Sequence, residues 1–532
     1  MFFPAPTSPH QRPRTMTKPV PVPDDKPALE SISDPHTAGL FKLVRVAADK
    51  FRRLSASDLP KAWREASPTL PTLKVPDVSS RLEVLASDDD AVVRPKPVQL
   101  LLRFNNAWLP FRDHEETWGS PEEARQGLEK KLGHYLPPAS VEWADAGETT
   151  NDLWARQALG SQNLRRITPE DNAQLGEVYV SAFEFMSKYR VRDGLLPYGG
   201  DAFMTADGRV VRIRLHGADY RPGDAGWAHA GFVYRSSSLV WSTLSDHVFR
   251  CHYLFMNPVL MATKRLLPLE EGLRHFLATF HYRTAAINHG GVFTLVPPGG
   301  MFHRTTGFDW ETLQHVYEDC LNSFRYETFK DSVTRRGLTL DTLGRDHARF
   351  MPSVSDGMEY WTRTRAFVDD VCDRSGAIAA ALGRGRDATN RWWDAIAHAY
   401  PGGLPELSDE TLRDMLTQIV FTVSATHEHV GNVAQYIRNP TLAAGKLWPG
   451  QTIADKQSSL HLCVVGAITG LEMPKLMEDF SHMMPDEYSR QAVRTFQNNL
   501  ADWQVELDER NTQRVQPFVS FSPRELSCSI AI

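Results

Sequence analysis

The segment HVFRCH carries two histidines, His247 and His252, whose imidazoles could bind a metal ion. They lie five residues apart, and in a regular α-helix residues at that spacing are rotated by about 140° from each other. The two side chains would converge on one ion only if the helix contained a π-bulge, a feature that is frequent at functional sites. Taken alone, the spacing is more typical of one surface histidine and one core histidine.

A second group of potential ligands lies in the segment SATHEHVGNVAQY, residues 424–436. It offers His427, Glu428, His429 and Asn432, and His427 and Asn432 are again five residues apart. Two such helices facing each other across a bundle would supply three imidazoles and a carboxamide, which suit iron or manganese as well as zinc. Histidine-rich helix faces also occur in proteins without a metal, so the spacing leaves both interpretations open.

The end of the sequence offers a carboxylate that could complete such a site. Neutral nitrogen and carboxamide ligands leave a cation undercompensated, so an anionic ligand would be favourable. The segment before the last residues SIAI is apolar and interrupted by proline, so it could enter the core and bring the α-carboxylate of Ile532 to the ion. The alternative is a C-terminal strand that is buried for packing alone.

The composition argues against several other functions. The 532 residues carry 59 basic and 65 acidic side chains, a net charge of −6, which argues against a nucleic-acid-binding protein. The five cysteines are scattered and form no CxxC pair, so neither a thiolate zinc site nor a disulfide framework is expected. The apolar stretches are too short to span a membrane, and no secretory signal is recognisable. We expect a monomeric, cytoplasmic protein.

The elements that must position these residues are predicted to be mainly helical. Residues 1–35 are rich in proline and predict a disordered lead, and 36–150 a smaller helical and mixed portion in which 67–97 is typical of a linker. The segment 205–217 predicts a hairpin that turns at Asp207-Gly208. The fold class is therefore mainly α, with one large domain over 151–532. Its helical patterns cover 243–265, 269–289, 311–331, 359–383, 388–400, 408–437, 456–468 and 487–509.

Taken together, these segments resemble the lipoxygenase family. The likeness begins at DLWARQALG, residues 152–160, continues through HVFRCH, and includes the stretch from Arg265 to Asn288. SATHEHVGNVAQY resembles the family's second ligand cluster, and the terminal SIAI resembles its last residues. The likeness covers residues 150–532 in order. Residues 1–150 show too few alternating strands for the β-barrel lipid-binding domain of many members, so the chain is similar to the shorter, bacterial or fungal type.

The resemblance implies a helical catalytic domain around one mononuclear non-haem iron, with manganese as the alternative. It also implies that Gln435 supports the metal ligands without binding the ion itself. The implied activity is that of a dioxygenase, which abstracts hydrogen from a polyunsaturated fatty acid and inserts O2 to give a hydroperoxide. The implied metal ligands are His247, His252, His427, Asn432 and the carboxylate of Ile532.

One departure from the family pattern bears on the ligands. The family places its asparagine four residues after the third histidine, whereas Asn432 follows His427 by five. We favour His427 as the ligand, with a π-type bulge that absorbs the extra residue. Glu428 and His429 are the alternatives for the third side-chain ligand.

Other departures bear on the substrate. The segments that line the channel in the family are shortened here, so the pocket is expected to differ. Arg438 is a candidate anchor for the carboxylate of a long substrate, although a helix C-terminal cap would account for it equally well. His289 and Gly290 are candidates for the pocket wall, and a tight turn is the alternative for the glycine. The shortening motivates two other functions: an oxidase, cyclase or isomerase for a specialised metabolite, and a non-catalytic lipid-binding relative.

Overall fold

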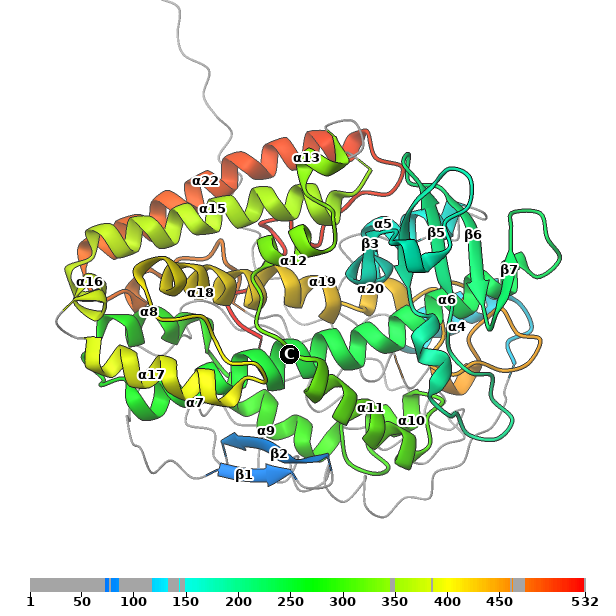
Figure 1. Cartoon of the computed structure of the whole chain (residues 1–532), viewed down its shortest axis with the longest axis horizontal. Helices are drawn as coiled ribbons and strands as arrows, with labels where there is room; N and C mark the ends of the chain where they lie inside the picture. Colours follow the sequence, from blue (N-terminus) through cyan, green and yellow to red (C-terminus); the bar gives the residue numbers. More distant parts are fainter. Residues whose placement is uncertain are drawn as a thin grey trace, which may run out of the picture.

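The computed structural model describes residues 72–75, 78–85, 117–132, 143, 149–344, 350–383, 386–459, 462 and 474–530. The expected disordered lead lies outside these ranges. A body of helices carries a five-stranded sheet and a separate two-stranded sheet (Figure 1). The predicted mainly α fold with a smaller mixed N-terminal portion is therefore confirmed. Within the described ranges, no helix combines the length and the apolar character that crossing a bilayer requires.

A short antiparallel sheet of β1 (Thr72–Val75) and β2 (Ser79–Leu85) occupies part of the predicted linker, so that prediction is wrong. In β2 the buried Leu82 and Val84 alternate with more exposed neighbours, the period of two that a half-buried strand requires. The prolines and aspartates that indicated a loop flank the two strands and do not interrupt them. The sheet packs below α9 in Figure 1, and Asn257 Nδ2 donates to the carbonyl of Glu83 at 2.6 Å.

The larger sheet is an antiparallel meander whose strands follow one another in chain order. The predicted hairpin is confirmed: Gly208 adopts a left-handed φ of 80° in the turn, where glycine avoids a steric clash. A buried ion pair ties the sheet together, since Arg212 donates through Nε and Nη2 to both oxygens of Glu177 at 2.6 Å. The strands are β3 (Leu164–Arg166), β4 (Glu177–Ala182), β5 (Asp201–Thr205), β6 (Val210–Leu215) and β7 (Ala218–Tyr220).

Helices fill the rest of the described chain. Most predicted helices are present, although 456–468 lies largely outside the described residues. The pattern at 311–331 is divided, because α11 ends at Ser323 and α12 begins at Phe329. The pattern at 269–289 is divided as well, because α8 ends at Phe280 and Arg283 adopts a φ of 57° before α9 begins at Thr284. An apolar period does not reveal such a break when both helices are buried. The outer and connecting helices are α4 (Pro121–Leu132), α5 (Thr149–Gln157), α8 (Gly272–Phe280), α9 (Thr284–Thr294), α10 (Met301–Thr305), α11 (Trp310–Ser323), α12 (Phe329–Arg335), α13 (Leu340–Leu343), α15 (Pro352–Arg374), α16 (Gly376–Leu382), α17 (Arg386–Ala399), α20 (Ala434–Ile437) and α22 (Glu487–Thr512). Short 3-10 turns are η2 (Leu159–Asn163), η3 (Pro169–Asp171), η4 (Glu184–Lys188) and η7 (Ser481–Met483).

Two long helical rods carry the predicted metal ligands. The first runs from α6 (Trp227–Trp241) through the π-helix η5 (Ser242–Met256) into α7 (Asn257–Leu266). The second runs from α18 (Asp409–Phe421) through the π-helix η6 (Thr422–Thr426) into α19 (His427–Gly431). Outside them α15 and α22 lie side by side (Figure 1), and the rings of Phe367 and Phe496 stack with centroids 4.5 Å apart.

Candidate metal centre

The first histidine pair lies in the π-helix η5, as its spacing requires. Hydrogen bonds from residue i+5 to residue i place side chains five apart on one face of the helix. The backbone N–H of Asn257 donates to the carbonyl of His252 in this pattern. The return to α-helix coincides with Pro258, which has no backbone N–H to keep in register. The predicted π-bulge is confirmed, and it turns His247 and His252 in the same direction.

The second π-helix lies in a different place from the one predicted. The sequence predicts a bulge between His427 and Asn432, but η6 ends at Thr426, just before His427. From His427 to Gly431 the helix is a regular α-helix, and Asn432 terminates it with φ −78° and ψ 63°. The extra turn of η6 therefore sets the direction of His427 and leaves Asn432 beyond the helix end.

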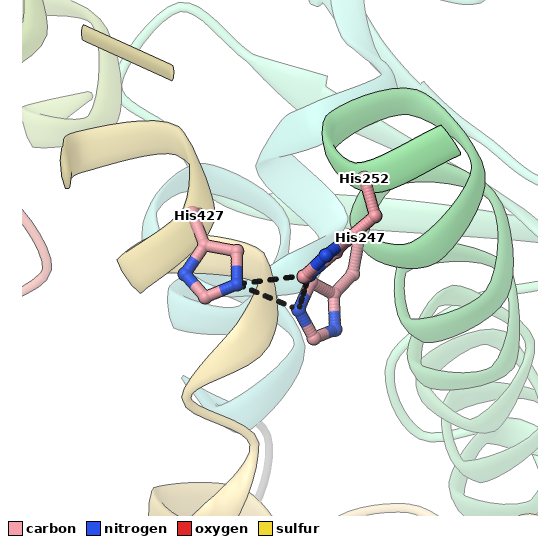
Figure 2. Close-up of side chains that lie close together, drawn as sticks. All are labelled: His247, His252 and His427. Carbon is pink, nitrogen blue, oxygen red and sulfur yellow. Dashed lines mark hydrogen bonds between the residues drawn. The ribbon is translucent and has the colours of Figure 1, made fainter. Parts of the chain in front are cut away.

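The three imidazoles meet at one point between the two rods. The Nε2 atom of His427 lies 3.0 Å from Nε2 of His247 and 3.1 Å from Nε2 of His252, and the last two atoms are 3.2 Å apart. Figure 2 shows His427 facing the other two across the gap between the helices. His252 and His427 are buried and His247 is partly buried.

The donor set fits a cation. Burial lowers the pKa of His247 well below its usual value, and burial lowers the pKa of His252 to about 4, so both rings are neutral at neutral pH. Neutral imidazoles with converging ring nitrogens repel one another unless a cation lies between their lone pairs. Nitrogen ligands about 2.1 Å from an ion lie about 3.0 Å apart at octahedral angles and about 3.4 Å apart at tetrahedral angles. The observed separations of 3.0–3.2 Å are therefore compatible with three nitrogens that bind one ion.

A supporting residue that sequence reasoning gave no role is Asn288, in α9. Its Oδ1 atom lies 3.1 Å from Nδ1 of His252 and is placed to accept the N–H of that nitrogen. This contact fixes the ring orientation and leaves the Nε2 lone pair free to point at the other histidines. The side chain of Asn288 is 1% exposed.

The alternatives for the third ligand point elsewhere. His429 Nε2 lies 3.1 Å from Ser161 Oγ, and its ring packs against Phe518 and Phe521. Glu428 Oε1 accepts a hydrogen bond of 2.7 Å from Asn432 Nδ2. Burial raises the pKa of Glu428. Of the three candidates, His427 is the one that the structure brings to His247 and His252.

The other predicted site residues are placed as follows. Arg438 stands at the C-cap of α20, and its Nη1 lies 3.3 Å from Glu129 Oε2 of α4, so the capping alternative describes its position. His289 is partly buried in α9 with its ring edge-to-face on Phe293, and Gly290 lies in the same helix, so the tight-turn alternative does not apply. Gln435 is buried in α20. Ile532 lies outside the described residues, and the chain that leads to it is fully buried at Ile530.

A cavity of about 570 Å³ adjoins the two ligand helices, and His247, His252 and His427 are not among the described residues that line it. Asp246 and Thr426, which immediately precede His247 and His427, contribute to its wall. Burial raises the pKa of Asp246 to about 6. Charged side chains such as Arg250, Glu327 and Arg335 also line it. The predicted substrate-binding residues Arg438, His289 and Gly290 are not among the described residues that line this cavity.

Known proteins share both the sequence pattern and the fold. No family model matches the sequence. The hydroperoxide isomerase ALOXE3 of Mus musculus is 24% identical over 343 residues, which cover 58% of this chain and 46% of that protein. The putative linoleate 9S-lipoxygenase 3 of Oryza sativa subsp. japonica is 23% identical over 423 residues, which cover 68% and 47%. The chain thus spans about half the length of these curated relatives.

Solved structures show the same architecture. A calcium-dependent 11R-lipoxygenase superposes with a TM-score of 0.64 at 20% identity, covering 93% of this chain and 80% of that one. The manganese lipoxygenase of Gaeumannomyces graminis superposes with a TM-score of 0.64 at 13% identity, covering 94% and 99%. The fold is therefore that of a lipoxygenase. In sequence, too, the chain is similar to lipoxygenases.

Proposed function

We infer that this protein is a metal-dependent dioxygenase of lipoxygenase type. The observation that carries the proposal is the convergence of Nε2 of His247, His252 and His427 within 3.0–3.2 Å of one another. In the proposed reaction a C–H bond between two double bonds breaks, and a C–O and an O–H bond form. Both atoms of O2 enter the hydroperoxide, so no external reductant is needed. Iron is the proposed ion, with manganese as the alternative.

The protein's own residues would hold and tune the ion. The three imidazoles would bind the ion, and Asn288 would keep the ring of His252 in the binding orientation. Neutral ligands leave most of the ion's charge uncompensated, which favours an oxidising centre. A bound redox-active ion supplies the one-electron oxidation that activates the C–H bond. Asn432 and the carboxylate of Ile532 remain proposed ligands.

A second candidate function is the isomerisation of a hydroperoxide, or the oxidation of a specialised metabolite, on the same fold. Two observations favour it. The similar proteins include hydroperoxide isomerases. The cavity that adjoins the two ligand helices is lined by charged side chains such as Arg250 and Glu327, an environment that suits a polar substrate better than a long hydrocarbon chain.

Metal analysis tests both enzymatic proposals against a non-catalytic lipid-binding relative. Purified protein is assayed for iron, manganese and zinc by inductively coupled plasma mass spectrometry. We expect close to one equivalent of iron or manganese per chain. Less than about a tenth of an equivalent, also after anaerobic addition of either metal, would reject an active metal centre.

Substrate assays then separate the two enzymatic functions. The metal-loaded protein is incubated with linoleic or arachidonic acid, and O2 uptake and conjugated-diene absorbance are followed. A dioxygenase consumes O2 as the diene appears. An isomerase shows neither change, but it consumes an added fatty-acid hydroperoxide under anaerobic conditions.

A further inference from the structure

Gly431 lies so close to the histidine cluster that a side chain at this position would contact His247. It is the last residue of α19, one turn after His427 and on the same face of the helix. A Cβ atom added to it would lie 2.9 Å from Nε2 of His247, 3.2 Å from Cε1 and 3.3 Å from Cδ2. The contact would fall on the ring nitrogen that faces the other two histidines.

The backbone itself does not require glycine at this position. Gly431 is absent from the glycines with a left-handed φ, so an alanine would adopt the same conformation. Alanine also has the higher helix propensity. The one feature that excludes a side chain is therefore the ring of His247. The Nε2 atom of that ring lies 3.0 Å from His427 Nε2 and 3.2 Å from His252 Nε2, so displacing the ring to admit a Cβ would break the convergence of the three nitrogens.

Asn432, the residue that follows Gly431, does not fill this place. Asn432 lies beyond the end of α19, and its Nδ2 donates to Glu428 Oε1 at 2.7 Å. Five residues after His427 in a regular α-helix, its direction is rotated by about 140° from that of the imidazole. On the side of the cluster that Gly431 covers, the second rod thus presents backbone alone.

We propose that Gly431 is a positioning residue that keeps one side of the His247 ring clear, so that an ion held by the three histidines retains an open coordination position there for a small exogenous ligand. The inference rests on the proposed metal-dependent function. The ligand would be a small anion or a neutral oxygen donor, because Gly431 borders that side with its backbone alone. Azide serves as the probe.

The first test uses metal-free protein, so that it does not depend on the proposed function. The melting temperatures of wild type, Gly431→Ala, His247→Ala and the double variant form a double-mutant cycle. We expect Gly431→Ala to lower the melting temperature by several degrees in the wild-type background, and to leave it unchanged or higher when His247 is replaced. An equal loss in both backgrounds would overturn the clearance role. Gly376→Ala is the matched control, since Gly376 begins α16 and a Cβ there meets nothing within 4 Å.

The second test measures the metal and its open position. Ferric protein is titrated with azide, and the charge-transfer absorbance is followed together with iron content. We expect wild type and Gly376→Ala to bind azide alike. We expect Gly431→Ala either to bind azide at least tenfold more weakly or to lose at least tenfold in iron affinity. Unchanged iron and azide affinities in Gly431→Ala would overturn the inference, as would iron-loaded wild type that binds no azide. A protein that takes up no iron rejects the proposed function and leaves the melting cycle to decide the role of Gly431.

Discussion

The Oδ1 atom of Asn288 lies 3.1 Å from Nδ1 of His252, across the contact between α9 and η5. This pairing fixes which ring nitrogen of His252 carries the proton. The nitrogen that faces His247 and His427 is then the one with the lone pair. A residue far from the ligand motifs in sequence thus determines how one of them can bind.

Replacing Asn288 should therefore weaken metal binding without removing a ligand. We expect Asn288→Leu to lower iron affinity by about 10–100-fold, the usual effect of losing a residue that orients a metal-bound imidazole. Asn288→Asp keeps an oxygen acceptor at the same position and should retain most of the affinity. The measurement is a competition titration with a chromophoric chelator. Equal affinities of the leucine and aspartate variants would contradict the orienting role.

The choice between His427 and His429 can be made with one pair of variants. His427→Ala should lose the metal, because its Nε2 is one of the three converging nitrogens. His429→Gln should keep close to the wild-type metal content per folded protein, because His429 contacts Ser161 instead. Metal content is measured on fractions whose circular dichroism confirms folding. Loss of metal from folded His429→Gln, with retention in His427→Ala, would reverse the assignment.

Breaking the buried ion pair between Arg212 and Glu177 in the larger sheet should lower stability more than breaking an exposed ion pair. Both side chains are 0% exposed, so removing Glu177 leaves the buried Arg212 guanidinium with one ion pair among the described residues, to the partly exposed Asp219 at 3.0 Å. Glu177→Ala is expected to lower the free energy of unfolding by about 3–5 kcal/mol. Glu318→Ala, which breaks an exposed pair with Arg81, should cost less than about 1 kcal/mol. Urea denaturation of metal-free protein measures both.

Acid should destabilise the protein partly through His281. Burial lowers the pKa of His281 to about 3, and the charges of Lys264 and Arg274 act in the same direction. The unfolded chain, in which this pKa is about 6.5, binds the proton first, so stability is full above that pH and falls as the pH decreases toward 3. Between about pH 7 and about pH 5 this site should account for a loss of about 2 kcal/mol.

The pH prediction is checked by urea denaturation of wild type and His281→Gln at the two pH values. The variant has no imidazole to protonate, so its loss of stability on acidification should be smaller by that amount. His398→Gln, on the exposed surface of α17, is the control and should keep the wild-type dependence. A profile of His281→Gln that parallels wild type would contradict the prediction.

Sequence patterns predicted the helical body well because long amphipathic helices repeat their apolar period over many residues. They missed β1 and β2, which are too short for a clear period and are surrounded by prolines. They also missed the break at Arg283, where a left-handed φ divides two buried helices. Spacing alone identified His247 and His252 as a pair that requires a π-helix, and η5 provides it.

The second half of the site was harder to predict because a single extra helical residue can be absorbed in more than one place. The count from His427 to Asn432 suggested a bulge between them, but the π-turn lies before His427. That difference of a few residues decides whether Asn432 or Gly431 lies beside the histidines. Asn288 has no spacing relation to either cluster, so only the packing of α9 on η5 reveals it.

The separation of the two ligand helices along the chain has a consequence for biosynthesis. His427 follows His252 by 175 residues, so the second half of the site leaves the ribosome roughly 9–35 s after the first at ordinary elongation rates. During that interval the early histidines have no partner with which to hold an ion in place. Metal capture by the complete histidine cluster must therefore follow the synthesis of His427.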